Sequence, residues 1–131
     1  MQNNFAKKLI ELKLLAERLI EGRNKQNGLF TISHQVLFVL SARDSVCPKE
    51  IIEKLGIAKS NLAIVAKKLL KDGLIVSKKS KENHKEIYYS ITKKGEEALE
   101  QKLNQICQLG GENTKPLDEA IALLNSAKEN N

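Results

Sequence analysis

The side chains best suited to chemistry in this sequence are lysines, and they gather in its second half. Ten lysines and only three acids lie between Lys59 and Lys94, a local excess of positive charge larger than the formal net charge of +6 of the whole chain. A concentrated positive segment beside a near-neutral remainder suits the binding of phosphate groups. A lysine-rich solvated surface would have the same composition, so charge alone leaves both interpretations open.

Side chains for catalysis or metal binding are few and scattered. The two histidines are His34 and His84, and the two cysteines are Cys47 and Cys107. Their spacing matches no metal site, and no glycine-rich phosphate loop is present. We therefore expect no enzyme activity, no metal and no cofactor. Both cysteines are expected to be reduced thiols, and a redox-sensing role for either stays open.

The first part of the lysine-rich segment is predicted to be an amphipathic helix over residues 59–72. Its apolar residues share about one third of the helix circumference and are expected to face the core: Leu62, Val65, Ala66 and Leu69. The opposite face and its flanks are expected to be exposed and to contact a ligand: Lys59, Ser60, Asn61, Ala63, Ile64, Lys67, Lys68 and Lys71.

This exposed face has the order of residues that reading a DNA major groove requires. The first residues of a recognition helix approach base edges, and Asn61 can bond an adenine edge through two hydrogen bonds. Ser60 is less selective, and Ala63 or Ile64 could touch a thymine methyl group. The later lysines can reach phosphates, which anchor a protein without reading sequence. An ordinary amphipathic helix with a lysine-rich wet side would have a similar pattern.

A β-hairpin is predicted to follow this helix. Leu74-Ile75-Val76 forms a first strand, and Ile87, Tyr89 and Ile91 alternate with polar or exposed positions in a second. The segment between them, residues 77–86, forms a basic wing that can lie along a DNA backbone or enter a minor groove. Its expected contact residues are Lys78, Lys79, Lys81, His84 and Lys85.

The helix before residue 59 completes a helix-turn-helix unit. Pro48 suits the first position of a helix, and Gly56 suits its end. The apolar run in residues 33–42 is expected to be a central helix buried on most sides, with Thr31 or Ser33 as its cap. The expected fold is mainly α with a small β-hairpin wing, a winged helix-turn-helix of the α+β class.

The two ends of the chain are predicted to be dimerisation helices. The helix over residues 4–22 is apolar on more than one side, so it has to be covered on more than one side. Two further helices are expected, one capped by Thr92 and one beginning at Pro116. We divide the chain into an N-terminal dimerisation segment 1–30, a DNA-binding domain 31–92 and C-terminal dimerisation helices 93–131. With no secretory signal or membrane span visible, we expect a cytoplasmic protein.

These motifs together resemble the MarR family of winged-helix regulators. The resemblance covers roughly residues 5–127 and rests on three kinds of segment: the helix-turn-helix from Pro48-Lys49-Glu50 to Lys59-Ser60-Asn61-Leu62, the exit Leu69-Leu70-Lys71-Asp72-Gly73-Leu74-Ile75, and the end of the wing, Tyr89-Ser90-Ile91-Thr92-Lys93-Lys94-Gly95. The family wing commonly carries an Asp-x-Arg turn, and this sequence has Asn83-His84-Lys85 at the matching positions.

The resemblance implies a homodimer that binds a near-palindromic operator in double-stranded DNA, usually as a repressor. It places recognition-helix contacts on Lys59, Ser60, Asn61, Ala63 and Ile64. It also implies a small-molecule effector, often an aromatic acid bound between the DNA-binding lobe and the dimer helices.

Two other functions compete with this interpretation. A winged helix can act as a protein-interaction module without binding DNA, and another winged-helix regulator family could share a similar dimer. The lysine-rich segment favours DNA over the interaction module, since a wing that binds protein does not need such a local charge.

Overall fold

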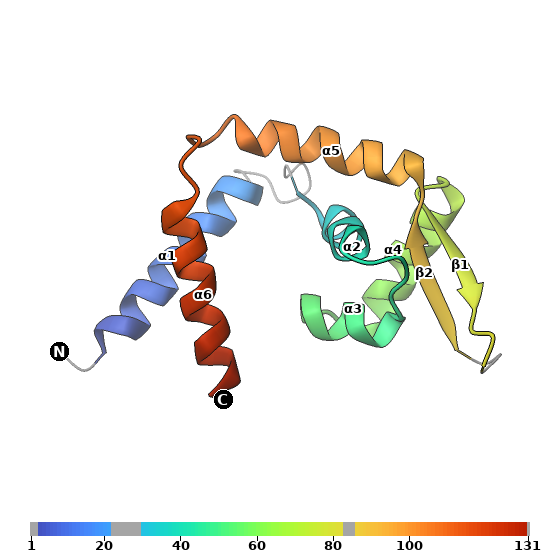
Figure 1. The fold of residues 1–131 in the computed structure, drawn as a ribbon, viewed down its shortest axis with the longest axis horizontal. Coiled ribbons are helices and arrows are strands. Elements are labelled where there is room, and N and C mark those ends of the chain that lie inside the picture. The colour runs from blue at the N-terminus through green and yellow to red at the C-terminus, as the bar shows by residue number, and fades with distance from the viewer. Residues whose placement is uncertain (1–2, 22–29, 83–85, 131) are drawn as a thin grey trace.

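The computed structural model describes residues 3–21, 30–82 and 86–130. Within them, six helices and one hairpin follow each other along the chain (Figure 1). Their bounds are α1 (Asn4–Glu21), α2 (Ile32–Ser41), α3 (Pro48–Leu55), α4 (Lys59–Lys71), β1 (Ile75–Lys79), β2 (Ile87–Ile91), α5 (Lys93–Cys107) and α6 (Lys115–Glu129). The predicted fold class, mainly α with a small β-hairpin, is confirmed.

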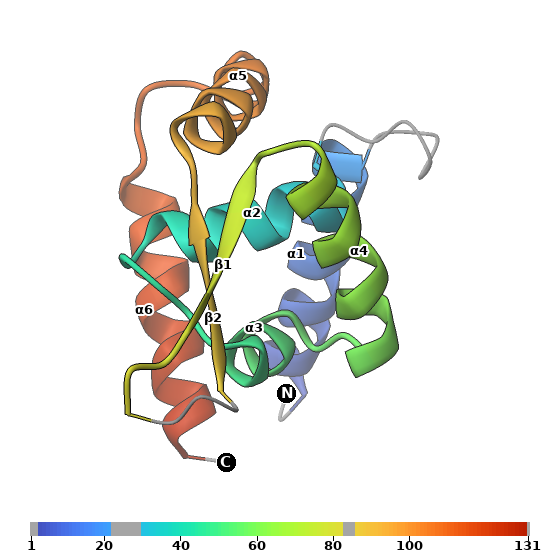
Figure 2. The same ribbon diagram turned by 90° about the vertical axis from the view of Figure 1, so that its right-hand side faces the viewer.

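The centre of the fold is α2, which is buried on most of its circumference as predicted. Val36, Leu37, Val39 and Leu40 are all buried, because α5, α3, α4 and the hairpin all contact this helix. Figure 2 shows α2 running behind the hairpin, between α5 above and α3 below. The remaining buried residues come from the surrounding elements and complete one core: Val46, Ile51, Leu62, Ala66, Leu69, Ile75, Tyr89 and Leu99.

The hairpin differs from the predicted one in length. Its two strands pair antiparallel from Ile75 opposite Ile91 to Lys79 opposite Ile87. The first strand therefore continues three residues past Val76, and Lys78 and Lys79 belong to the strand rather than to the tip. The polar character of residues 77–79 hid this extension, since β1 is exposed beyond Ile75 and has no apolar alternation there.

A short third segment extends the hairpin on its other side. Val46 and Tyr89 exchange two backbone hydrogen bonds of 2.9 Å, which attaches the chain just before α3 to the outer edge of β2. Arg43 adds a hydrogen-bonded ion pair to Glu50 of α3 at 2.6 Å. These contacts fix the start of α3 against the wing.

The first and last helices leave large apolar side chains uncovered. They lie beside each other and apart from the winged helix (Figure 1), and residues of both, including Leu9 and Leu124, line one shallow hollow. On α1, Leu14 and Leu19 are 59% and 60% exposed, and on α6, Leu117 is 60% exposed. Both helices are therefore apolar on more than one side, as the sequence predicted for α1.

None of the helices in the described ranges is both long enough and apolar enough to cross a bilayer.

Candidate nucleic-acid interface

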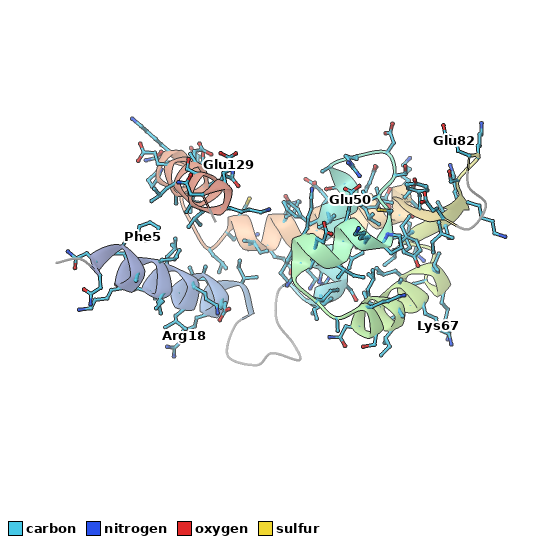
Figure 3. All side chains as sticks on the ribbon, turned by 90° about the horizontal axis from the view of Figure 1, so that it is seen from below. Phe5, Arg18, Glu50, Lys67, Glu82 and Glu129 are labelled. Atoms are coloured by element: carbon cyan, nitrogen blue, oxygen red, sulfur yellow. The ribbon has the colours of Figure 1, made fainter. Side chains whose placement is uncertain are left out.

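The faces of α4 are oriented as the sequence predicted. Leu62, Ala66 and Leu69 are buried and Val65 is half-buried. Every residue predicted to contact a ligand from this helix is exposed: Lys59, Ser60, Asn61, Ala63, Ile64, Lys67, Lys68 and Lys71. Ile64, with 70% of its surface exposed, is the most exposed large apolar side chain in the described ranges. Figure 3 shows Lys67 projecting from the outer side of α4, away from the neighbouring helices.

The start of α4 is placed by a tight turn from α3. Gly56 adopts a left-handed conformation with φ of 64°, and its N–H donates to the carbonyl of Ile52 at 2.9 Å, which ends α3. Ala58 is the N-cap of α4 and has no side chain that could accept from the first N–H groups. These N–H groups at the positive end of the helix dipole can therefore donate to a phosphate.

The other end of α4 is held to α5 by a cluster of hydrogen bonds. Thr92 donates through Oγ1 to the carbonyl of Gly73 at 2.7 Å and accepts from the N–H of Gly95 at 3.0 Å, as its predicted role as a cap requires. The Nζ of Lys94 donates to the carbonyl of Asp72 at 2.9 Å. Lys94 therefore caps the C-terminus of α4. In the sequence, its charge was counted as part of the lysine-rich segment that suits phosphate binding.

The wing presents its lysines on two faces and at its turn. Lys78 lies opposite Tyr88 and Lys79 opposite Ile87, so the two side chains leave the hairpin on opposite faces. Lys81 is exposed in the turn, where the backbone N–H of Glu82 donates to Ser80 Oγ at 3.2 Å. His84 and Lys85, the other predicted wing residues, lie outside the described residues.

A hollow of about 750 Å³ separates the start of α4 from the wing, and we call it the wing hollow. Its walls combine apolar side chains with two lysines, one from each helix of the helix-turn-helix. The lining residues are Cys47, Pro48, Lys49, Ile52, Lys59, Leu62, Ala63, Glu86, Ile87, Tyr88 and Tyr89. Sequence reasoning did not find this hollow, because its walls come from three segments that only the fold brings together.

Tyr88 and Lys49 are the polar residues of this region that the sequence did not single out. The Tyr88 hydroxyl donates to Glu86 Oε2 at 3.2 Å, and this hydrogen bond to a carboxylate raises the pKa of Tyr88. The sequence did contain a signal for Tyr88. Successive side chains of a strand point to opposite faces, so Tyr88 has to lie on the face opposite to the buried Tyr89.

His34 and the two cysteines lie within the described residues, and each has a clear place in the fold. His34 Nδ1 accepts from the N–H of Thr31 at 3.1 Å, so His34 closes the start of α2. Burial, and then the charge of Lys102, lower the pKa of His34. Cys47 is half-buried and Cys107 is exposed, and both are free. The described part of the chain has no cluster of three His, Cys, Asp or Glu that could hold a metal ion.

Comparison with solved structures shows which proteins share this architecture. BpsR of Bordetella bronchiseptica is 16% identical, with a TM-score of 0.69, over 94% of this chain and 91% of BpsR; its structure concerns regulation of DNA binding by 6-hydroxynicotinic acid. The multiple antibiotic resistance repressor MarR is 19% identical, with a TM-score of 0.71, over 95% of this chain and 92% of MarR. Reduced AbfR bound to DNA is 15% identical, with a TM-score of 0.69, over 98% of this chain and 92% of AbfR. The fold predicted from the resemblance to the MarR family is therefore confirmed.

Comparison with family models identifies the central part of the chain. No curated protein sequence matches the chain. Residues 32–109, more than half of the chain, match the family described as winged helix DNA-binding domain. This match favours DNA binding and argues against the protein-interaction module. The chain belongs to the winged helix DNA-binding domain family, and it carries that domain within a fold shared with the MarR repressor.

Proposed function

We propose that this protein is a homodimeric transcription repressor that binds a near-palindromic operator. In this proposal α4 enters the major groove, and the wing lies on the backbone or in the adjacent minor groove. Residues 31–92 form the DNA-binding domain, and residues 1–30 and 93–131 form the dimer. We propose that the protein acts by binding DNA and has no enzyme activity. The cytoplasm remains the predicted location.

One observation carries the proposal: the polar and basic face of α4 is exposed along its whole length while its apolar face is buried. Asn61 and Ser60 lie in its first turn, where base edges are approached, and Lys67 and Lys71 lie further along. The N–H groups at its start have no side-chain cap from Ala58, and they are available to a phosphate. We propose Lys59, Ala63, Ile64 and Lys68 as the remaining contacts of this helix.

The wing contributes contacts that do not read sequence. We propose that Lys78, Lys79, Lys81, His84 and Lys85 contact phosphates or the minor groove. Lys78 and Lys79 leave opposite faces of the hairpin, so a DNA strand on one face of the wing meets only one of them. Lys81 lies in the turn and is not restricted to either face.

The homodimer is supported by the uncovered apolar surface of α1 and α6. Residues such as Leu14, Leu19 and Leu117 are more than half exposed in the single chain. Covering this surface with a second copy removes apolar area from water, at about 25 cal/mol for each Å². Sedimentation at micromolar concentration should therefore give a dimer. A monomer under these conditions would remove the argument for a two-fold operator.

The most direct test selects bound duplexes from a random DNA pool. A two-fold motif with half-site centres about one helical turn apart is expected, because each protomer presents one α4. A selected motif without two-fold symmetry would contradict the dimeric mode of binding, and no enrichment at all would contradict sequence-specific recognition. The relatives BpsR and AbfR, whose structures concern DNA binding, support the choice of duplex DNA as the ligand.

A small-molecule effector is also proposed, on the basis of the relative whose DNA binding is regulated by 6-hydroxynicotinic acid. A thermal-shift screen of small organic acids with the purified chain would find such an effector. A compound that raises the melting temperature and releases DNA is the expected result.

A further inference from the structure

Ile64 lies at the centre of the face of α4 that we propose reads DNA. It is 70% exposed, whereas Leu62 and Leu69 on the opposite face are buried. Its side chain therefore adds little to the core, and its apolar surface leaves water only when an apolar group of a ligand covers it. A single exposed apolar side chain is common on protein surfaces, so the neighbours of Ile64 decide what it can contact.

The neighbours of Ile64 on the helix surface suit a nucleic acid. Residues three or four positions apart on a helix are neighbours, so Asn61 and Lys68 flank Ile64 on one side and Ser60 and Lys67 on the other. All four are exposed and polar, and the two lysines suit phosphates. Base pairs present mainly hydrogen-bonding groups in the major groove, and the apolar group that they offer there is the 5-methyl group of thymine.

The spacing of Asn61 and Ile64 matches that of neighbouring base pairs. The two residues are three positions apart, which corresponds to about 4.5 Å along the helix axis. Base pairs stack about 3.4 Å apart, so the two side chains reach bases separated by one or two steps. Ala63 lines the wing hollow and therefore lies on the flank of α4, not at the centre of its exposed face.

The basic side chains of the wing suit phosphates better than base edges. The three arginines of the chain are Arg18, Arg23 and Arg43, and none of them belongs to α4 or to the wing. Arg43 is already paired with Glu50 at 2.6 Å. A guanidinium group is planar and weakly hydrated, which favours recognition in a groove, whereas the ammonium group of lysine is a compact and strongly hydrated charge.

We infer that this protein reads its operator in the major groove alone and that Ile64 determines part of the sequence preference. Ile64 packs on the 5-methyl group of a thymine that lies one or two base pairs from the adenine bonded by Asn61. The wing holds phosphates and reads no bases. This inference rests on the proposed DNA-binding function and deepens it, because it gives each half-site an adenine and a thymine at a defined spacing.

The first test removes single methyl groups from an operator obtained by selection. Each thymine is replaced by uracil together with its two-fold mate, and the Kd is measured by fluorescence anisotropy. Burial of one methyl group is worth about 0.8 kcal/mol, or about fourfold in Kd, so the change in both half-sites should weaken binding about fifteenfold. The sensitive thymine should lie within about two base pairs of the adenine at which Asn61→Ala loses discrimination. The absence of a sensitive thymine, or a more distant one, would overturn the inference.

Variants of Ile64 test whether this side chain makes the contact. Ile64→Ala should bind the thymine and uracil operators within about twofold of each other, and Ile64→Val should keep most of the difference. Leu70→Ala is the matched control, because Leu70 is an exposed apolar residue of the same helix outside the proposed contacts. A loss of folded protein changes both Kd values equally, so their ratio remains informative. An unchanged ratio in Ile64→Ala would assign the methyl effect to DNA shape or to another residue and contradict the inference.

The second test changes one groove of the operator at a time. Diaminopurine in place of adenine adds an amino group in the minor groove, whereas a hypoxanthine–cytosine pair in place of adenine–thymine changes only the major-groove edge. We expect diaminopurine to leave the Kd within about twofold, and hypoxanthine–cytosine at the Asn61 position to raise it about tenfold or more. Weakening by diaminopurine would refute reading in the major groove alone.

The two proposals fail in different ways. A selection that enriches no duplex would refute the proposed function and this inference with it. An enriched operator that binds equally well with uracil in place of every thymine would refute this inference and leave the proposed function standing.

Discussion

Lys67 and Lys94 belong to the same lysine-rich segment, but the structure gives them different surroundings. Lys67 is exposed on the outer face of α4 (Figure 3). Within the described ranges it has no hydrogen bond or ion pair. The ammonium group of Lys94 donates to the carbonyl of Asp72 at 2.9 Å. We predict that Lys67→Ala reduces the salt dependence of DNA binding and that Lys94→Ala does not.

The size of the effect follows from the number of phosphates that each variant loses. Each neutralised phosphate contributes about 0.9 to the slope of log affinity against log salt concentration. With roughly six phosphates neutralised in each dimer, the slope is about −5.4, which is a loss of affinity on the order of 10³-fold between about 50 and 200 mM salt. Lys67→Ala removes one contact from each protomer, so the slope should become less steep by about 1.8.

Fluorescence anisotropy of a labelled duplex over this salt range measures both slopes. The two variants lose the same formal charge. A difference between their slopes therefore reflects the loss of a local contact with DNA and not a change in the long-range electrostatic field of the protein. Lys94→Ala should instead lower the free energy of unfolding, by at most about 1 kcal/mol for an exposed hydrogen bond. If Lys94→Ala flattened the salt dependence as much as Lys67→Ala, the argument from local contacts would be refuted.

Four further changes test separate parts of the structure. Asn61→Ala should weaken binding to a selected operator by about 1–3 kcal/mol in gel shifts and leave binding to random duplex almost unchanged; unchanged binding to both would show that the reading face is misplaced. Lys79→Ala with Lys81→Ala should weaken both kinds of binding alike, and a loss confined to the operator would contradict phosphate contact. Gly95→Ala should lower the free energy of unfolding by about 1–3 kcal/mol in urea titrations, because a Cβ there would overlap the carbonyl oxygen of Leu74; unaltered stability would mean that the α4–α5 junction can shift. The lowered pKa of His34 means that the unfolded chain takes up a proton at a higher pH than the folded chain, so stability should fall as the pH drops below about 6.5, and His34→Asn should reduce this loss.

The helix-turn-helix could be predicted from the sequence because its signals are local. Leu62, Ala66 and Leu69 repeat at the period of a helix, and the same residues are buried in the structure. Gly56 ends α3 with the positive φ that glycine adopts at little cost. Neither signal depends on parts of the chain that are distant in sequence.

The length of the wing could not be predicted, because the partner strand determines it. Residues 77–79 are polar and exposed, and nothing in their own pattern distinguishes a strand from a loop. They form a strand because they pair, residue by residue, with Tyr89, Tyr88 and Ile87 of β2. A strand with so few buried residues is recognised only when its pairing is known.

The wing hollow and the junction between α4 and α5 also depend on contacts between distant segments. Thr92 was expected to cap α5, but its second hydrogen bond, to the carbonyl of Gly73, spans nineteen residues. The same turn of chain brings Lys94 to the end of α4. Periodicity and capping rules concern neighbours in sequence, so they predicted the first role of Thr92 and not the second.

The structure therefore separates lysines that a count of charges treats alike. Lys94 donates to a carbonyl at the end of α4, whereas Lys67 and Lys71 are exposed, as the phosphate contacts that we propose for them require. Lys59 is exposed at the start of α4 and also lines the wing hollow. The number of phosphates contacted should thus be smaller than the number of lysines. The slope of log affinity against log salt concentration measures the number of phosphates contacted, whereas the sequence alone gives only the number of lysines.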